Sequence, residues 1–114
     1  MSSKTLFERI IDREIPADIL HEDEHCIVFR DIAPQAPTHV LIVPRKAYPS
    51  IDAMSEQDGL LAGHLLLVAR SIAARESLGS GYRVVINTGP HGGQTVNHLH
   101  VHVLGGRQME WPPG

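Results

Sequence analysis

The sequence predicts one α+β domain of 114 residues, in which two helices accompany five short strands. Apolar residues recur at helical spacing in two stretches, and short apolar runs bounded by turn residues fill much of the remainder. One run, from His98 to Val103, alternates histidine with apolar residues, as in a strand with two unlike faces. A chain of this length buries about two-thirds of its unfolded surface. We therefore expect a single domain over residues 1–114.

Composition argues against a nucleic-acid-binding, disulfide-bonded or membrane-spanning protein. The chain has 10 Lys and Arg against 13 Asp and Glu, so it lacks the positive charge that nucleic-acid backbones require. Cys26 is the sole cysteine, which excludes an internal disulfide and a C-x-x-C zinc framework. The N-terminus lacks the apolar core of a signal peptide, and the apolar run Leu60–Ile72 is interrupted by polar residues. We expect no membrane span and a cytoplasmic location, or also a nuclear one in a eukaryote.

The first helix is expected over Ser3–Glu14, where Ser3 or Thr5 can cap the start and Pro16 stops the helix. Five stretches carry strand signals: Ile19–Glu22, Cys26–Arg30, His39–Val43, Tyr82–Asn87 and the histidine run that starts at His98. A turn at Asp23-Glu24 joins the first two strands. The third strand is an almost unbroken apolar run, which predicts a central position with both faces covered.

The longer helix is expected from Ser55 to about Leu78, and one of the glycines that follow would end it. His64 lies near the apolar stripe of this helix, so we interpret it as a packing or interface residue rather than a ligand. Cys26 is interpreted as a small core residue, because only His25 offers a nearby positive charge that could activate a thiolate.

The histidine run predicts a metal-binding or catalytic site rather than an ordinary solvent-exposed strand face. On a strand, His98, His100 and His102 would share one face at intervals of about 6.6 Å. Surface faces usually use other polar residues, which leaves a metal site or a nucleophilic histidine. The outer two Cα atoms would lie about 13 Å apart, too far for one zinc ion. A metal would therefore need two of these histidines and a third ligand such as His39 or Cys26.

A nucleophilic histidine is the other interpretation. Neutral imidazole has a pKa of about 6.5 and attacks phosphorus through its unprotonated nitrogen. The loop Thr88–Thr95 precedes the histidine run and contains Gly89, Gly92 and Gly93, so its backbone N–H groups can approach an anion. His39, at the start of a buried strand, is expected to share this site. The combination predicts a phosphate-bearing substrate.

The run His98–Leu104 resembles the His-x-His-x-His-x-x motif of the histidine triad (HIT) superfamily. Three further segments are similar to the Hint branch of that superfamily: Asp31–His39, Gly92–Val96 and Leu104–Gly114. The resemblance extends from about Leu6 to Gly114. It implies a HIT fold, a five-stranded antiparallel sheet with two helices, which forms a homodimer with a joined ten-stranded sheet.

The resemblance implies a purine nucleoside phosphoramidase, a hydrolase that splits the P–N bond of adenosine or guanosine 5′-phosphoramidates and of adenylates such as lysyl-AMP. The products would be AMP or GMP and an amine, formed through a covalent nucleotidyl-histidine without a cofactor or metal. By position, His100 would be the nucleophile, His102 would contact the phosphate and His98 would support the network. His39 would be hydrogen-bonded so as to orient His100, and Thr95 would supply a hydroxyl for the leaving amine.

The same resemblance implies a set of nucleotide-binding residues. Asp31 and Asn87 would hold the ribose, with Ile32 against the base, and backbone groups of Gly93 and Thr95 would meet the phosphate. The full set is Asp31, Ile32, Asn87, Gly93, Gln94, Thr95, His100, His102 and Trp111.

The C-terminal Trp111 would reach the neighbouring subunit's site and influence substrate choice. Two positions depart from the family: Thr95 replaces the Ser of animal members, and Asn97 stands where an aromatic residue is frequent. Three alternatives remain open, namely a dinucleoside polyphosphate hydrolase, a nucleotide-binding scaffold dimer and a zinc-binding protein. The Trp-Pro-Pro-Gly tail argues against the first of these.

Overall fold

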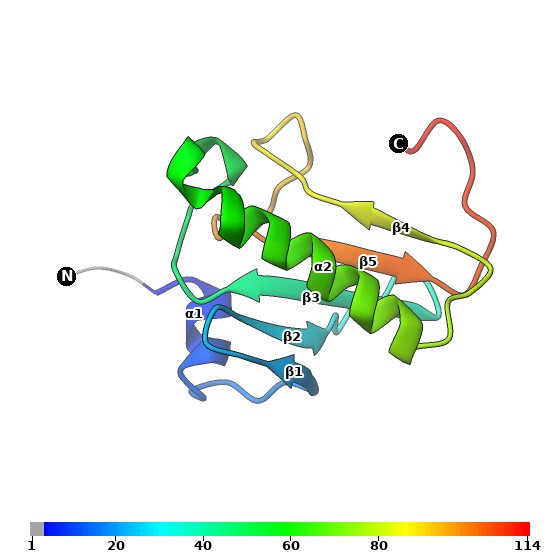
Figure 1. The fold of residues 1–114 in the computed structure, drawn as a ribbon, viewed down its shortest axis with the longest axis horizontal. Helices are drawn as coiled ribbons and strands as arrows, with labels where there is room; N and C mark the ends of the chain where they lie inside the picture. Colours follow the sequence, from blue (N-terminus) through cyan, green and yellow to red (C-terminus); the bar gives the residue numbers. More distant parts are fainter. Residues whose placement is uncertain (1–3) are drawn as a thin grey trace.

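A five-stranded antiparallel sheet forms the centre of the computed structural model, which describes residues 4–114 (Figure 1). The order across the sheet is β1-β2-β3-β5-β4. The strands are β1 (Ile19–Glu22), β2 (Cys26–Arg30), β3 (Thr38–Pro44), β4 (Tyr82–Val85) and β5 (Val101–Gly105). The helices are α1 (Leu6–Ile11) and α2 (Gly59–Arg75), with 3₁₀ turns η1 (Ile51–Ala53) and η2 (Glu56–Asp58) between β3 and α2.

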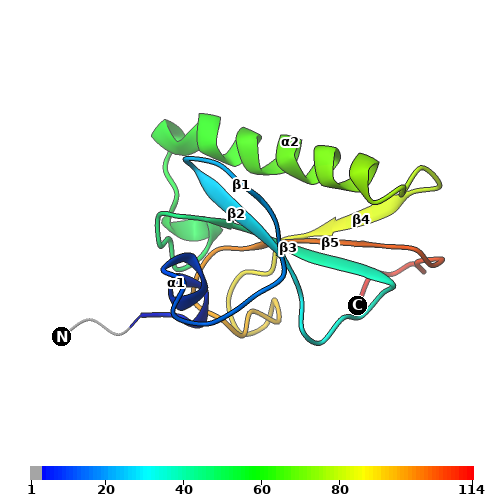
Figure 2. The same ribbon diagram turned by 90° about the horizontal axis from the view of Figure 1, so that it is seen from below.

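The two helices cover opposite faces of the sheet (Figure 2). Under α2, strands β2, β3 and β5 contribute a core that includes Val28, Val40, Ile42, Val101 and Val103. On the other face, α1 packs with a second buried cluster: Phe7, Ile10, Ile27, Phe29, Leu41 and Val43. Strand β3 is buried on both faces along most of its length, which confirms the predicted central strand. Within residues 4–114 neither helix is both long and apolar enough to cross a bilayer.

The histidine run keeps the predicted alternation of faces, but only part of it is a strand. Leu99, Val101 and Val103 pack under α2, whereas the rings of His98 and His100 contact Phe7 of α1. Strand β5 begins only at Val101, so the expected strand start at His98 is wrong.

Strand β5 starts late because of Pro44 in the neighbouring strand β3. The register pairs Ile42 with Val101, so continued pairing would place Leu99 opposite Pro44. Proline has no N–H to donate. The N–H of Leu99 instead donates to the carbonyl of Tyr48 at 2.7 Å, and the carbonyl of Pro44 accepts from the side chain of His98 at 2.8 Å.

Helix α1 is shorter than expected at both ends. It begins after Thr5, which forms a capping box with Glu8, while the alternative cap Ser3 lies outside the described residues. Its last residue is Ile11 rather than Glu14. Arg13 follows with φ 62°, and the N–H of Glu14 turns back to the carbonyl of Arg9. The helix therefore ends through a left-handed residue before Pro16 can stop it.

Helix α2 also differs from the prediction at its ends. Ser55 caps the 3₁₀ turn η2, and the α-helix begins only at Gly59. The helix ends at Arg75 rather than near Leu78, because Ser77 adopts φ 60° and the N–H of Leu78 bonds to the carbonyl of Ala73 at 2.9 Å. The following glycines are not the cap.

Strands β1 and β2 and their turn at Asp23 lie where the sequence predicts them. Strand β4 ends at Val85 rather than Asn87, because Val85 pairs with His102 and β5 supplies only one further residue beyond it. The shortened β5 thus shortens its neighbour as well.

Candidate active site

A pocket of about 250 Å³ opens beside α1, on the face of the sheet opposite α2. Its walls are mainly apolar, from residues that include Leu6, Phe7, Ile10, Phe29, Leu41 and Val96. Four of the predicted site residues add polar groups: Asp31, Thr95, His100 and His102. Ile32 also lines the pocket and is 94% exposed, so it forms part of the rim. An apolar slot with a few convergent polar groups suits a flat organic ring that carries a charged substituent.

The tautomer of His100 is set by a backbone carbonyl. Nδ1 of His100 lies 2.7 Å from the carbonyl oxygen of His98, so this nitrogen carries the proton and donates it. In the neutral ring the lone pair is then on Nε2. The ring is buried and lines the pocket, which gives the site a neutral imidazole with an available nucleophilic nitrogen.

His98 holds the backbone that orients His100, because both of its ring nitrogens form hydrogen bonds. Its Nε2 donates to the carbonyl of Pro44 at 2.8 Å, which leaves Nδ1 to accept from the hydroxyl of Thr5 at 3.1 Å. The ring is fully buried and both nitrogens are satisfied. His98 is thus a structural link between β3 and α1, and its carbonyl is the group that orients His100.

A second chain of hydrogen bonds starts at Gln35. The backbone N–H of Gln35 donates to Nδ1 of His39 at 3.0 Å, so the proton of neutral His39 is on Nε2. That Nε2 donates to Nδ1 of His102 at 2.9 Å. The proton of His102 is therefore on Nε2, which among residues 4–114 is the buried side-chain polar atom without a hydrogen-bond partner. The site holds a donor ready for an incoming acceptor.

The predicted partner of His39 is wrong. His39 was expected to orient His100, but its hydrogen bond is to His102. The register explains this, because β3 and β5 pair His39 with Leu104 and Leu41 with His102. His39 and His102 are therefore diagonal neighbours on one face, within reach of each other. His100 precedes β5 and lies too far along the chain for this contact.

The rings form a continuous cluster. The centroids of His100 and His102 lie 4.9 Å apart, and those of His39 and His102 lie 5.2 Å apart. Burial lowers the pKa values of His39, His98 and His100, and with the positive charges of protonated His100 and His39 it lowers the pKa of His102 to about 4. All four rings are thus neutral near pH 7, which the fixed tautomers require.

Asp31 borders this cluster. Its Oδ1 accepts the N–H of Ala33 at 2.8 Å, and its Oδ2 lies 3.5 Å from Nε2 of His39. Asp31, His39 and His102 together offer three ligand atoms within 4.8 Å of one another, so they could also hold a metal ion. Cys26 does not belong to this group, because it packs in the core under α2. The interpretation of Cys26 as a core residue is confirmed by its complete burial.

Several predicted nucleotide-binding residues do not line the pocket: Asn87, Gly93, Gln94 and Trp111. The side chain of Gln94 accepts from Gly89 and donates to the carbonyls of Pro49 and Val96, so it braces the loop that precedes the histidines. Trp111 is 83% exposed, in a tail that lies at the opposite end of the molecule from α1 (Figures 1 and 2).

Other residues of the site have no signal in the sequence. Phe7, Phe29 and Leu41 wall the pocket, but their residue types and spacing are equally typical of a core. The sequence indicates Thr5 as a helix cap, but nothing in it indicates the contact of Thr5 with His98. The contribution of Gln35 is a backbone N–H, which no side-chain pattern reveals.

Comparison with known proteins gives a consistent assignment. A model of the HIT domain matches residues 12–109. An uncharacterised HIT-like protein of Synechococcus elongatus is 58% identical over 115 residues, which span 100% of both chains. A Zea mays protein named 14 kDa zinc-binding protein is 52% identical over 114 residues, covering 98% of this chain and 89% of its own length. The crystal structure of a HIT family hydrolase from Legionella pneumophila superimposes with a TM-score of 0.95 and 47% identity, over 97% of this chain and 100% of the other.

Proposed function

This chain belongs to the HIT domain family, and we propose that it is a purine nucleoside phosphoramidase of the Hint branch of that family. One structural relative is a HIT family hydrolase, and another, from Candida albicans, is named a histidine triad nucleotide-binding protein. The observation that carries the proposal is the pairing of two fixed tautomers in one pocket. His100 has its lone pair on Nε2, and His102 has its proton on Nε2.

The two tautomers match the two requirements of phosphoryl chemistry. Nε2 of His100 attacks phosphorus, and the bond between phosphorus and the amine nitrogen breaks. The proton on Nδ1 of His100 remains bonded to the carbonyl of His98, which spreads the positive charge of the nucleotidyl-histidine. Nε2–H of His102 donates to a phosphate oxygen, whose negative charge increases in the transition state.

The leaving amine takes one proton, delivered from solvent by way of the hydroxyl of Thr95, which lines the pocket. In the second step a water molecule attacks phosphorus, the bond to Nε2 of His100 breaks, and the water proton returns to solvent. The nucleoside monophosphate leaves and His100 is again neutral. Dividing the displacement in this way replaces one difficult step by two easier ones.

The apolar walls supply the binding site for the purine. Phe7, Phe29 and Leu41 provide flat and branched surfaces next to the histidines, and Ile32 covers the base from the rim. Asp31 lies at the boundary between this apolar region and the histidine cluster. We assign it to the ribose hydroxyls, which need an acceptor at that boundary.

The proposal includes a homodimer. Strand β4 is an edge strand with Val84 37% exposed, and α2 exposes Leu60 and Leu67 by 92% and 60%. These two leucines are seven residues apart and share a helix face. A second copy packed against β4 and α2 would cover these side chains and extend the sheet to ten strands. Trp111 of one subunit would then reach the pocket of the other, and sedimentation that gives only monomer at micromolar concentration would contradict this assembly.

A metal-dependent function is the second candidate. Asp31, His39 and His102 offer three possible ligands, and a relative from Zea mays is named a zinc-binding protein. The phosphoramidase mechanism requires His102 to carry a proton that it can donate, whereas a metal site requires His102 to offer a lone pair. A metal would occupy the nitrogens that the hydrogen-bonded cluster uses to fix its tautomers.

The deciding experiment measures hydrolysis of an adenosine phosphoramidate with a fluorescent amine leaving group, using chelator-treated protein. We expect release by the wild type and a loss of about 10⁴-fold or more for His100→Ala. His25→Ala, an exposed histidine on the β1–β2 turn, serves as the matched control and should keep full activity. Equal turnover by His100→Ala would exclude the covalent mechanism, and activity only after zinc is restored would favour the metal-dependent candidate.

A further inference from the structure

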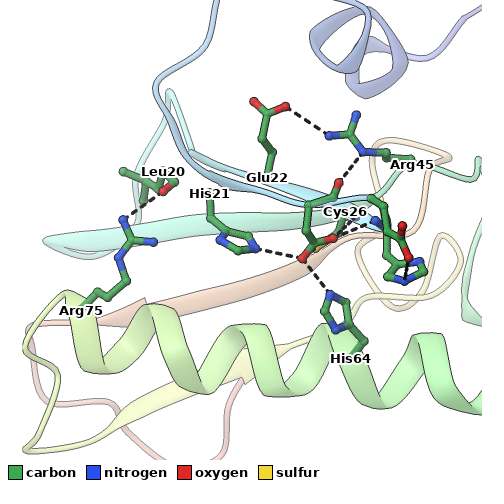
Figure 3. A network of polar contacts seen from close by, with 10 residues as sticks. Leu20, His21, Glu22, Cys26, Arg45, His64 and Arg75 are labelled. Atoms are coloured by element: carbon green, nitrogen blue, oxygen red, sulfur yellow. Dashed lines mark hydrogen bonds and ion pairs between the residues drawn. The ribbon is translucent and has the colours of Figure 1, made fainter.

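A second cluster of metal-ligand side chains lies under α2, on the face of the sheet opposite the candidate active site (Figure 3). It is centred on Asp23, in the turn between β1 and β2. Oδ2 of Asp23 lies 2.9 Å from Nε2 of His21, 2.8 Å from Nε2 of His64 and 3.6 Å from Sγ of Cys26. Two imidazoles and a thiol thus converge on a single carboxylate oxygen.

The carboxylate of Asp23 is fixed before any ligand arrives. Its Oδ1 accepts the backbone N–H groups of His25 and Cys26 at 2.8 and 2.9 Å. These bonds hold the turn and leave Oδ2 directed at the other side chains. Such support from backbone groups is typical of the partners that orient metal ligands in proteins.

A β-bulge aims His21 at this cluster. Ile19 pairs with Phe29, but His21 pairs with Val28, so that Leu20 is an extra residue in β1. Residues directly opposite in a sheet share a face. Without the bulge, His21 would share the face of Ile19 and Phe29, which pack in the α1-side core. With it, His21 joins Val28 and Cys26 on the face covered by α2, and bulges of this kind are typical next to functional sites.

From this geometry we infer that His21, Asp23, Cys26 and His64 form a zinc-binding site, separate from the histidine pocket. Nitrogen, sulfur and carboxylate oxygen are the ligands that zinc uses in tetrahedral sites. With bonds of about 2.0 to 2.3 Å, neighbouring ligand atoms in such a site are about 3.3 to 3.8 Å apart. The ligand atoms of His21, Asp23 and Cys26 lie within 4.8 Å of one another, whereas Nε2 of His64 is placed by its 2.8 Å contact with Oδ2 of Asp23. Zinc binding therefore requires the imidazole of His64 to turn from Asp23 toward the other three ligands.

The charges also balance. Zinc binding displaces the proton from the thiol of Cys26, while each imidazole stays neutral by moving its proton from Nε2 to Nδ1. One proton is released per ion, and the thiolate and the carboxylate of Asp23 together neutralise the dication. A neutral complex suits a site whose imidazoles and carboxylate are only 25% to 35% exposed. His21 and His64 remain open enough for an ion to enter from solvent.

The bound ion would connect the β1–β2 turn to the middle of α2. These segments are joined in the structure by the hydrogen bond between His64 and Asp23. Four coordination bonds would replace that contact, so zinc is expected to stabilise the folded chain and raise its Tm. The role is structural, because all four ligand positions are filled by the protein.

The test uses the full-length chain, stripped of metal by a chelator under reducing conditions and then titrated with Co²⁺. Because Cys26 is the sole cysteine, a thiolate-to-cobalt charge-transfer band can arise only from this site. We expect one such band per chain, displaced by Zn²⁺, with release of one proton. His64→Gln should raise the Kd by more than about 10-fold, the lower bound for losing even a supporting partner of a metal ligand.

Two control variants separate this site from the other cluster. His25→Gln changes a neighbouring exposed histidine, and His39→Gln removes a ligand from the group on the opposite face. Both should keep the charge-transfer band and the zinc-dependent rise in Tm. Cobalt binding without the band, a band unaffected by His64→Gln, or a band lost in His39→Gln would each overturn the assignment. His64 is 35% exposed on a helix surface, so its variant is expected to fold even where Cys26→Ala does not.

Discussion

The hydroxyl of Thr5 lies 3.1 Å from Nδ1 of His98, although the two residues are 93 positions apart. The same oxygen accepts the backbone N–H of Glu8 at 3.1 Å and so caps α1. One atom therefore begins the helix that walls the pocket and supports the histidine whose carbonyl orients His100. The stability of α1 and the orientation of His100, the proposed nucleophile, are coupled through this contact.

Replacing Thr5 should expose that coupling. Thr5→Ala removes the helix cap, which is expected to lower the free energy of unfolding by about 1 to 2 kcal/mol. It also leaves Nδ1 of His98 without its donor, so kcat should fall as well. Thr5→Ser keeps the hydroxyl and should restore most of both properties. Chemical denaturation and phosphoramidate kinetics measure the two effects, and an unchanged kcat in Thr5→Ala would show that the support is not needed.

Replacing His39 should affect the reaction more than nucleotide binding. His39→Ala removes the donor that places the proton of His102 on Nε2. Loss of the correct tautomer is expected to lower kcat by about 10²-fold, the lower range for one positioned proton donor. The Kd for AMP should change little, because the pocket walls remain. ¹⁵N NMR of the imidazoles would show a mixed tautomer at His102, and a wild-type spectrum in this variant would contradict the proposed relay.

The pH dependence of kcat/KM should reflect the buried imidazoles. Burial lowers the pKa of His100, the proposed nucleophile, below its ordinary value of 6.5, so the neutral imidazole persists in mildly acidic solution. The acidic limb of the profile is therefore expected below pH 6.5. A limb at or above this value, measured with a leaving group that does not titrate in the range, would mean that His100 is solvated in the free enzyme.

Conformational stability should decrease in the same range of pH. The pKa of His102 is lowered from 6.5 to about 4, so the unfolded chain binds more protons than the folded chain between these values. The free energy of unfolding therefore falls as the pH decreases from about 6.5 to about 4 and loses no more from this group below that. Urea denaturation of the wild type and His102→Gln at several pH values would isolate the contribution, which should be absent in the variant.

Removal of residues 107–114 should change substrate preference more than stability. The tail is largely exposed, and Trp111 contributes to neither of the buried clusters. We expect the relative kcat/KM values for different amine leaving groups to change, while the denaturation midpoint stays close to that of the full chain. Identical relative values across a series of substrates would show that the tail has no part in selection.

The elements of the fold could be predicted because local patterns determine them. The apolar run of β3 and the hairpin at Asp23 are properties of neighbouring residues. The predicted start of β5 and end of β4 are wrong, because they depend on the pairing partner that each residue meets across the sheet. The start of β5 depends on Pro44, which is far from it in sequence.

The histidines of the site could be predicted from the sequence, but their hydrogen-bond partners could not. Regular alternation identified the three imidazoles, but the bond from His39 to His102 follows from the register of two strands. The bulge at Leu20, which brings His21 next to Asp23 and His64, likewise has no signal in residue type. Polar contacts between distant segments were therefore the main part that sequence patterns could not supply.

Helix α1 is only six residues long, yet it carries Phe7, which contacts His98 and His100. Such a short segment opens by local unfolding at a lower free energy than the central strands of a sheet. Its amides are thus expected to exchange with solvent deuterium well before those of β3. On warming, we expect the chain to lose the wall of its proposed active site first and its sheet only later, so that thermal inactivation and thermal denaturation would be two separate events.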